Sequence, residues 1–379
     1  MAISSVLKIL ESVQNSYGLT RTLGEIQSWE NDDHTTFYRV GNSVMLFKIR
    51  LGGRWRAMRC YTRRVDNLAQ IYGDNYLPEE LYVYTNNREG RWIDVVLEEW
   101  IDGVTLKERV EEAVEANDRP TLKLLAQRFD IVAQKLLGGP TAHGDLTAEN
   151  IMVTPELQVQ LIDFDGMYLP QFHGQCSPEL GTAAYNPPSR TTLDFDPNID
   201  DFSIALISSA LHILSVKPEM YHKYRLYDGL LFSSELIDQQ RCEALEEAIE
   251  TFLALNMTRQ YRVATLLRMN TLRIAPLASI FGTIGAQPPR DSLLELTMLH
   301  GYVGYATPHT NQIIIPNIYD DGLEFSEGVV MVRLATKWLA IEPTGDVVMT
   351  FEGCQRVKSF RNGIARVLRG ETWEDVPRR

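Results

Sequence analysis

The feature that most constrains the fold of this chain is a change of hydrophobic period at Asp102–Gly103. Over 37–62 and 81–100, β-branched and aromatic residues flank Gly and Asn turns, a pattern typical of β-hairpins. Over 104–137, apolar residues recur at the spacing of amphipathic helices, and two short strand-like segments and further helices follow. The sequence therefore predicts an α+β protein, with a small β-rich part followed by a larger helical part.

Both ends of the chain differ from this central region. Residues 1–30 begin with an amphipathic stretch that lacks the basic n-region of a signal peptide, so we expect an N-terminal helical extension. Residues 269–297 contain GTIGAQPPR and are predicted to be a linker. In 298–379, the segment FSEGVVMVRL at 325–334 aligns with FRNGIARVLR at 360–369, an offset of 35 residues. A fixed period indicates stacked units, so we expect a β-rich domain with two copies of a repeat.

Charge and cysteine content restrict the partners and the compartment. The formal net charge of −13 disfavours binding to nucleic acid or to an anionic membrane, because both require a basic surface. The longest apolar run, at 204–216, is shorter than the about 20 residues of a membrane-spanning helix. The cysteines lack C-x-x-C spacing, so we expect buried thiols in a reducing cytoplasm for Cys60, Cys176, Cys242 and Cys354.

The strongest chemical signal is HGDLTAEN at 143–150, followed by LIDFDG at 161–166. Phosphoryl transfer from a nucleotide requires carboxylates and an amide oxygen around Mg²⁺, and a base near the attacking hydroxyl. Asp145, Asn150 and Asp163 supply this set of groups on loops that flank a short predicted hairpin. We expect the hairpin to bring the three side chains together.

HGDLTAEN resembles the catalytic loop H-R-D-L-x-x-x-N of protein kinases, and IDFDG resembles their D-F-G segment. The segment 181–188 resembles the end of the kinase activation loop, and 200–205 resembles the start of the central buried helix. The resemblance covers about residues 35–268. It implies a bilobal protein-kinase-like domain at 31–268.

The resemblance also implies roles for individual residues and cofactors. Asp145 would be the catalytic base, Asn150 and Asp163 would bind the metal, and the cofactors would be ATP and Mg²⁺. The nucleotide would be bound by the remaining glycine of the Gly-rich loop, by the strand that normally carries a lysine and by the segment between the lobes. These residues are Gly41, Ala57, Arg59, Glu99 and Trp100.

The sequence departs from the kinase pattern at several of these positions. Only Gly41 stands where kinases have three glycines, and Arg59 replaces the usual lysine. Arginine is planar and always charged, so this replacement is not conservative. No glutamate lies between Arg59 and Leu77 to form the usual ion pair, and Asp66 is the nearest acid. We expect Lys48 to be a solvated strand lysine, with a phosphate contact as the alternative.

Three functions remain open at this stage. The first is an active, divergent Ser/Thr protein kinase. The second is a pseudokinase that acts as a binding or scaffolding module, which the departures favour. The third is a small-molecule phosphotransferase, because Gly144 gives the HGD sequence found in aminoglycoside and choline kinases. The segments 57–60 and 163–167 resemble the A-x-R-C and D-[FY]-D-G-M signatures of a bacterial group of divergent kinase-like proteins.

The C-terminal region resembles WG-repeat sequences at Tyr319–Asp321, Phe325–Gly328 and Lys337–Trp338. Leu339 follows Trp338 where these repeats have glycine, so the region is divergent. We expect its aromatic residues to lie in a core. The expected partners are a nucleotide and a protein substrate or partner bound through the repeats, and neither nucleic acid nor a membrane.

Overall fold

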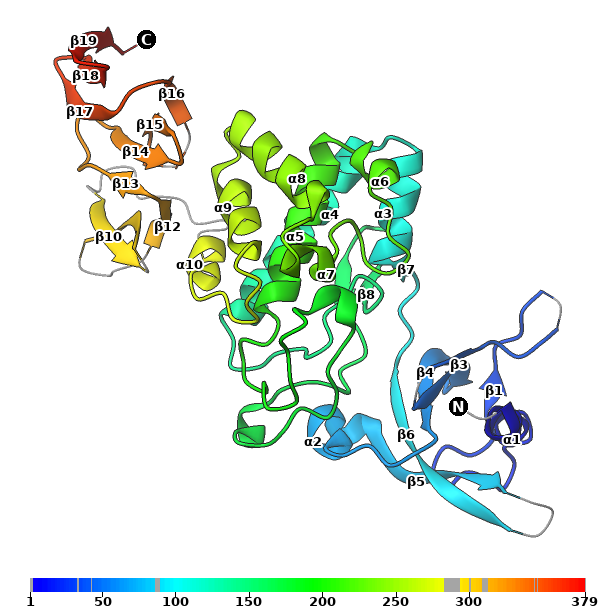
Figure 1. Cartoon of the computed structure of the whole chain (residues 1–379). Coiled ribbons are helices and arrows are strands. Elements are labelled where there is room, and N and C mark those ends of the chain that lie inside the picture. Colours follow the sequence, from blue (N-terminus) through cyan, green and yellow to red (C-terminus); the bar gives the residue numbers. More distant parts are fainter. Residues whose placement is uncertain are drawn as a thin grey trace. The chain divides into compact units, whose positions relative to one another are not determined.

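The computed structural model describes residues 3–32, 34–41, 43–85, 89–282, 294–299, 301–308, 313–343, 345 and 347–378. The chain forms two compact units, Met1–Gly103 and Val104–Arg379, and Figure 1 labels most of their elements. Helices account for 30% and strands for 31% of the structure, which confirms the α+β class. The predicted domain boundaries after residues 30, 268 and 297 stay predictions.

The first unit is an antiparallel sheet packed against helix α1 (Ile3–Gln14). Its strand order is β1-β3-β4-β6-β5, and β2 pairs with β3. Beside the sheet lies the short helix α2 (Leu68–Tyr72). The strands are β1 (Gln27–Ser28), β2 (Tyr38–Val40), β3 (Val44–Leu51), β4 (Arg54–Tyr61), β5 (Tyr76–Tyr84) and β6 (Gly90–Glu99). Both predicted hairpins, β3–β4 and β5–β6, are confirmed.

Turn geometry and alternation explain the first hairpin. Gly52 and Gly53 have φ values of 56° and 80°, which a two-residue turn with positive φ at both positions requires. Along β3, Met45, Phe47 and Ile49 are fully buried and pack in the same core as α1. Because side chains alternate along a strand, the intervening residues of β3 lie on the opposite face of the sheet.

The helical part of the second unit is built around α5 (Asp201–Val216), which is buried along most of its length. It packs against α4 (Arg119–Leu137), α8 (Glu243–Ala254) and α9 (Thr258–Leu267). Helix α3 (Leu106–Glu115) begins with a capping box between its first residues. The predicted helices over 104–137, 201–215 and 242–256 are thereby confirmed. The remaining helices are α6 (Met220–Lys223), α7 (Ser234–Asp238) and α10 (Leu277–Phe281).

A small three-stranded sheet lies at the start of the second unit. It consists of β7 (Val104–Thr105), β8 (Ile151–Val153) and β9 (Val159–Leu161), in that order. The last two strands are the two short strands that the sequence predicts. The segment between Gly166 and Asn198 is irregular. Its regular elements are two single-turn 3-10 helices, Pro170–Phe172 and Ala183–Tyr185, and the segment leads into α5.

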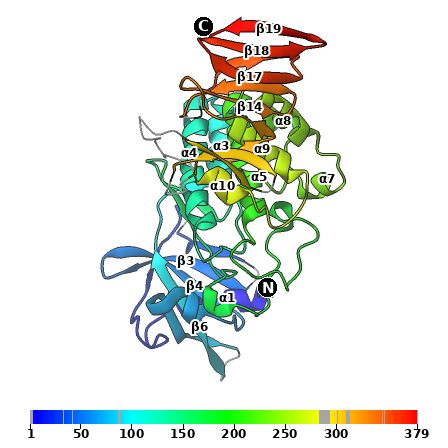
Figure 2. The ribbon, with the colours of Figure 1, turned by 90° about the vertical axis from the view of Figure 1, so that its left-hand side faces the viewer.

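The C-terminal region contains three small antiparallel sheets, which Figure 2 shows most clearly at β17–β19. Successive hairpins begin at residues 295, 330 and 364, which are 35 and 34 residues apart. The structure therefore has three copies of the hairpin, one more than the two copies that the sequence predicts. The strands are β10 (Glu295–Leu299), β11 (Tyr302–Ala306), β12 (Ile313–Tyr319), β13 (Asp321–Gly322), β14 (Val330–Leu334), β15 (Lys337–Ile341), β16 (Val347–Phe351), β17 (Arg356–Arg361), β18 (Ile364–Arg369) and β19 (Thr372–Pro377).

The repeats pack on the helical part of the same unit. Helix α10 lies within the segment 269–297 that was predicted to be a linker, and it packs against β12; residues 283–293 lie outside the described part. The guanidinium of Arg262, on α9, lies 3.3 Å from the ring centre of Tyr302, and a nitrogen lies 3.4 Å from Asp320 Oδ1. The expected core position of the repeat aromatics is confirmed for Tyr319 and Trp338, which are buried.

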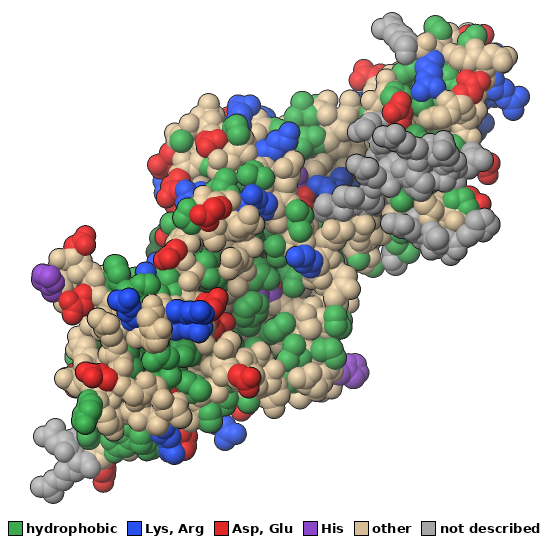
Figure 3. Space-filling model, turned by 180° about the vertical axis from the view of Figure 1, so that it is seen from behind, with side chains coloured by type: hydrophobic (Ala, Val, Ile, Leu, Met, Phe, Trp, Pro, Cys, Tyr) green, Lys and Arg blue, Asp and Glu red, His purple; other side chains and the backbone are tan. Residues whose placement is uncertain are grey.

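The surface agrees in part with the expectations from composition. On the face seen in Figure 3, acidic and basic side chains are interspersed, with no continuous basic area among its described atoms. In the described part of the chain, no helix combines the length and apolar character needed to cross a membrane. Burial of the thiol is confirmed for Cys60, Cys242 and Cys354, whereas Cys176 is exposed because it lies in the irregular loop before α5.

Candidate functional site

The predicted site loops lie next to each other in the second unit. Loop 143–150 precedes β8, and loop 162–166 follows β9. The two strands pair along their whole length, and the amide of Ile162 donates a hydrogen bond to the carbonyl of Asn150 at 3.0 Å. A short hairpin thus joins the two loops, as the sequence predicts.

The Asp145 carboxylate is fixed by hydrogen bonds from two directions. The amide nitrogen of Asn150 donates to the Asp145 carbonyl at 2.9 Å and to its Oδ2 at 3.2 Å. The backbone amide of Thr182 donates to Asp145 Oδ1 at 2.6 Å, and its hydroxyl donates to Oδ2 at 3.4 Å. Asp145 stays half-buried, so its carboxylate has a defined orientation and remains accessible to a substrate.

Asp163 adopts a backbone conformation that is uncommon for residues other than glycine. Its φ is 66°, in the left-handed region, where aspartate is tolerated at some cost in free energy. The residues around it are ordered: His143 Nε2 lies 2.9 Å from the Ile162 carbonyl, and the His143 and Phe164 rings are 5.2 Å apart. Strain of this kind is retained where the surrounding structure enforces it, as at functional sites.

Gly144 is required by close packing of the two loops. It has a φ of 85°, and a Cβ atom at this position would lie 2.0 Å from the Gly166 carbonyl oxygen. The buried Asp200 carboxylate accepts the amides of His143 and Gly144, at 2.5 and 2.9 Å. The Arg190 guanidinium donates to the Gly144 carbonyl at 2.8 Å. Glycine at 144 therefore has a steric cause, whichever substrate the protein uses.

Glu179 is a further acid at this site that the sequence did not indicate. Burial and the neighbouring carboxylates of Asp145, Asp163 and Asp165 raise the pKa of Glu179 to about 7. Burial of the carboxyl is the larger cause, and the repulsion from these acids adds to it. Glu179 and Arg190 lie in a loop without hydrophobic periodicity, which explains why sequence patterns did not identify them.

In the first unit, Ala57 and Arg59 lie on one face of β4. Ala57 pairs with Lys48 across β3, and these residues share the face opposite the α1 core. The Arg59 side chain is buried, with its guanidinium 5.9 Å from the ring centres of both Tyr61 and Tyr72. The structure therefore places two of the predicted nucleotide-binding residues, Ala57 and Arg59, on the same face of β4.

Lys48 lies in an aromatic cage, and its expected position as a solvated strand lysine is wrong. Its ammonium lies 4.5, 5.3 and 4.7 Å from the ring centres of Trp29, Trp55 and Trp100. An Asp102 carboxylate oxygen is 3.5 Å away, and the side chain is only 13% exposed. Cation–π attraction explains this burial. The three tryptophans come from separate segments, so no local pattern predicted the cage.

The other two residues predicted to bind a nucleotide lie at the ends of strands. Gly41 follows β2, and its amide donates to the Val44 carbonyl at 2.9 Å. Glu99 ends β6 with an exposed side chain whose Oε1 is 3.9 Å from an Arg56 nitrogen. All five predicted nucleotide-binding residues thus belong to the first unit, whereas Asp145, Asn150 and Asp163 belong to the second.

The donor set at Asp145 fits Mg²⁺ only with help from a substrate. Among the described residues, no three His, Cys, Asp or Glu side chains are grouped so that they could hold a metal ion. Because the Asn150 amide nitrogen donates to Asp145, its amide oxygen is the atom that could face a cation. Mg²⁺ commonly uses one or two protein oxygens together with phosphate oxygens and waters, and Asn150 with Asp163 fits that pattern.

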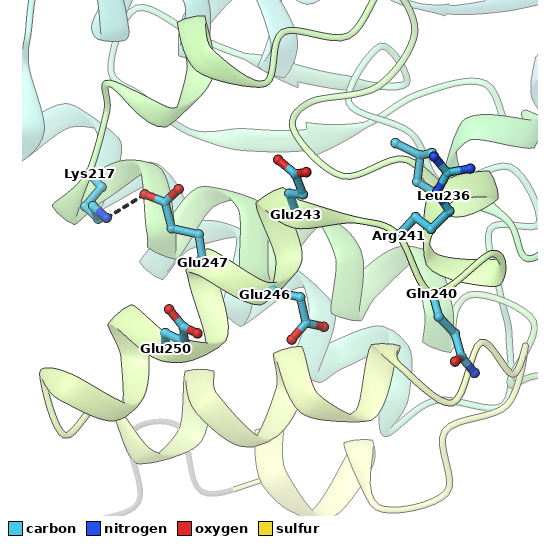
Figure 4. A pocket seen from close by; sticks show the side chains of 8 residues that line it. All are labelled: Lys217, Leu236, Gln240, Arg241, Glu243, Glu246, Glu247 and Glu250. Atoms are coloured by element: carbon cyan, nitrogen blue, oxygen red, sulfur yellow. Dashed lines mark hydrogen bonds and ion pairs between the residues drawn. The ribbon is translucent and has the colours of Figure 1, made fainter.

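A separate surface pocket on α8 has a different character. Figure 4 shows four glutamates of this helix beside Lys217 and Arg241. Glu247 accepts from Lys217 at 2.6 Å and from Lys223 at 2.7 Å, and these lysines lower the pKa of its carboxyl to about 2. These are ion pairs on the solvent-exposed face of a helix. None of the predicted site residues lines the pocket.

Comparisons with known proteins add no assignment to this geometry. No protein-family model matches the chain, and no match was found among curated proteins.

Proposed function

We propose that this protein is a divergent Ser/Thr protein-kinase-like phosphotransferase that uses ATP and Mg²⁺, with a bilobal kinase-like domain and a WG-like repeat region. The observation that carries the proposal is the orientation of the Asp145 carboxylate by Asn150 and Thr182, beside the loop of Asp163. A base with a fixed orientation next to two metal-binding oxygens is what phosphoryl transfer needs.

Each residue of the site has a role in this proposal. Asp145 accepts the proton of the attacking hydroxyl, and Asn150 and Asp163 would hold Mg²⁺. The ion would neutralise charge on the transferred phosphate. Arg59 would bind phosphate oxygens in place of lysine, through its planar guanidinium.

The Thr182 contact also bears on the substrate class. It belongs to the segment 181–188, which resembles protein kinases and not small-molecule kinases, so a protein hydroxyl is the preferred acceptor. The repeat region would supply a surface for a protein partner. The protein would act in the reducing cytoplasm, which fits four cysteines without a disulfide.

The test is transfer of labelled phosphate from ATP with Mg²⁺ to the protein itself and to a generic acceptor protein. Asp145→Asn should abolish transfer and leave nucleotide binding intact. Asp163→Asn should weaken the Mg²⁺-dependent part of binding. Arg59→Ala should weaken nucleotide affinity by about 1–3 kcal/mol, the range for a charge-assisted hydrogen bond. No rise in melting temperature at millimolar nucleotide, with or without metal, would contradict every enzyme function.

A pseudokinase is the second candidate, and the aromatic cage favours it. Lys48 is the cross-strand partner of Ala57, the residue predicted to contact adenine, and its ammonium is enclosed by indoles. Nucleotide binding without transfer, or no binding at all, would support a scaffolding module.

A further inference from the structure

A closed ring of hydrogen bonds connects Asp145 to Arg190. Thr182 donates its amide to Asp145 at 2.6 Å, Asn186 donates to the Thr182 carbonyl at 3.0 Å, and Arg190 donates to Asn186 Oδ1 at 2.7 Å. Arg190 then donates to the carbonyl of Gly144, the residue before Asp145, at 2.8 Å. The ring therefore closes through side-chain and backbone groups of two separate segments, 143–145 and 182–190.

We infer that Arg190 is a positioning residue for Asp145: it orders the segment 181–190 against the loop 143–150. This inference rests on the proposed function, in which Asp145 is the base. Arg190 is 8% exposed, so its charge acts in a medium where water screens it weakly.

The surrounding charges partly offset the cost of burying an arginine there. Burial lowers the pKa of the Arg190 guanidinium, and the carboxylates of Asp200, Asp145, Glu179 and Asp194 act in the opposite direction. Arginine keeps its proton in proteins and offers several donors in a fixed plane, which matches two acceptors on separate segments. A lysine would supply the charge but not both hydrogen bonds with the same geometry.

Two glycines make room for the ring, and the packing at Gly144 leaves no space for a basic side chain there. No side chain fits at Gly144, because a Cβ would lie 2.0 Å from the Gly166 oxygen. At Gly181, with a φ of 67°, a Cβ would lie 2.9 Å from Arg190 Nη1 and 3.0 Å from Asp145 Oδ1. The cation beside Asp145 therefore comes from position 190 and not from position 144.

The test compares Arg190→Met and Arg190→Lys with two matched controls. Arg119→Met removes an exposed arginine with one 4.0 Å ion pair, and Arg262→Met removes a buried arginine of α9 that contacts the repeats. We expect Arg190→Met to lower kcat by about 10- to 100-fold, the effect of losing hydrogen bonds to a charged group, with little change in KM for ATP. Arg190→Lys should recover part of kcat.

The split between kcat and KM separates positioning from simple destabilisation. Each kcat is divided by the folded fraction of the variant, measured by circular dichroism at the assay temperature. Both controls should then keep the wild-type kcat, whereas Arg190→Met should lose kcat at unchanged KM. An unchanged kcat in Arg190→Met, or a response equal to that of Arg262→Met, would overturn the inference.

A direct measurement distinguishes failure of this inference from failure of the proposed function. Hydrogen exchange of the Thr182 amide, which donates to Asp145, can be measured in the full chain whether or not it transfers phosphate. If the wild type has no activity but this amide exchanges faster in Arg190→Lys and Arg190→Met, the proposed function fails and the positioning role stands. If the exchange is identical in all three proteins, the positioning role is wrong. Arg190→Lys provides this result even if Arg190→Met does not fold.

Discussion

The ammonium of Lys48 lies 3.5 Å from an Asp102 carboxylate oxygen, enclosed by three indole rings. Trp100 Nε1 donates to the same carboxylate at 2.9 Å. These contacts connect β3 with the segment that follows β6. Lys48 therefore stabilises the end of the first unit, where Glu99 and Trp100 are predicted to bind the nucleobase.

We expect Lys48→Met to lower the free energy of unfolding by about 1–3 kcal/mol, because several cation–π contacts and one ion pair are lost from a shielded position. Chemical denaturation followed by tryptophan fluorescence measures this directly. Lys123→Met, at an exposed position on α4, is the control and should change stability little. Equal stability of the two variants would show that the cage contributes nothing.

The turns of two repeat hairpins differ in backbone strain. Ala335 and Gly370 occupy equivalent turn positions, with φ values of 51° and 59°. Alanine is strained in this region and glycine is not. Ala335→Gly should stabilise the protein by up to about 1 kcal/mol, and Gly370→Ala should destabilise it by a similar amount. Thermal unfolding of both variants is the measurement, and the same sign of change in both would contradict the argument.

Local patterns predicted the elements with a clear period. The glycine turn at Gly52–Gly53, the hairpin β8–β9 and helices α4 and α5 follow directly from residue spacing. The first repeat copy was missed because its sequence has diverged: in the alignment of 295–306 with 330–341, only Leu299 and Leu334 are identical. Its strands pair within their own sheet, β10-β11-β12, and share a core with β14, β15 and the helices, which no single segment reveals.

Some residues of the candidate site could be predicted from the sequence, and others could not. Asp145, Asn150 and Asp163 were identified because the chemistry of phosphoryl transfer requires a known set of groups at a short spacing. Arg190 and Glu179 reach the site from an irregular loop, through interactions between residues 14 to 46 positions apart in the chain. Tertiary contacts of this kind cannot be predicted from the local periodicity of hydrophobic residues.

The repeat region shares one hydrophobic core with the helices of the second unit. Val303, Tyr305 and Ile315 belong to the same buried cluster as residues of α5 and α9. An isolated fragment covering 298–379 would expose these side chains and also lose part of its first hairpin. We expect it to unfold without a cooperative transition, measured by circular dichroism on heating. A sharp, reversible melt of the fragment would show that the stacked hairpins are stable by themselves.

The acids around Glu179 predict how stability depends on pH. The pKa of Glu179 is raised from 4.5 to about 7 in the folded protein. Between these values the unfolded chain has already released the proton that the folded chain retains, so this residue makes stability fall as pH rises. Glu179→Gln carries no charge at any pH. Its stability relative to the wild type should therefore increase from pH 5 to pH 8, in urea unfolding.

Adding Mg²⁺ to the same unfolding experiment tests whether a metal binds near Glu179. A divalent cation near Asp145, Asp163 and Asp165 would offset their repulsion and lower the pKa of Glu179 towards its ordinary range. With Mg²⁺ and nucleotide present, the advantage of Glu179→Gln at pH 8 should shrink or disappear. Glu371→Gln, at an exposed position far along the chain, should match the wild type throughout. If the advantage of Glu179→Gln persists unchanged with both ligands, the metal does not bind among these acids.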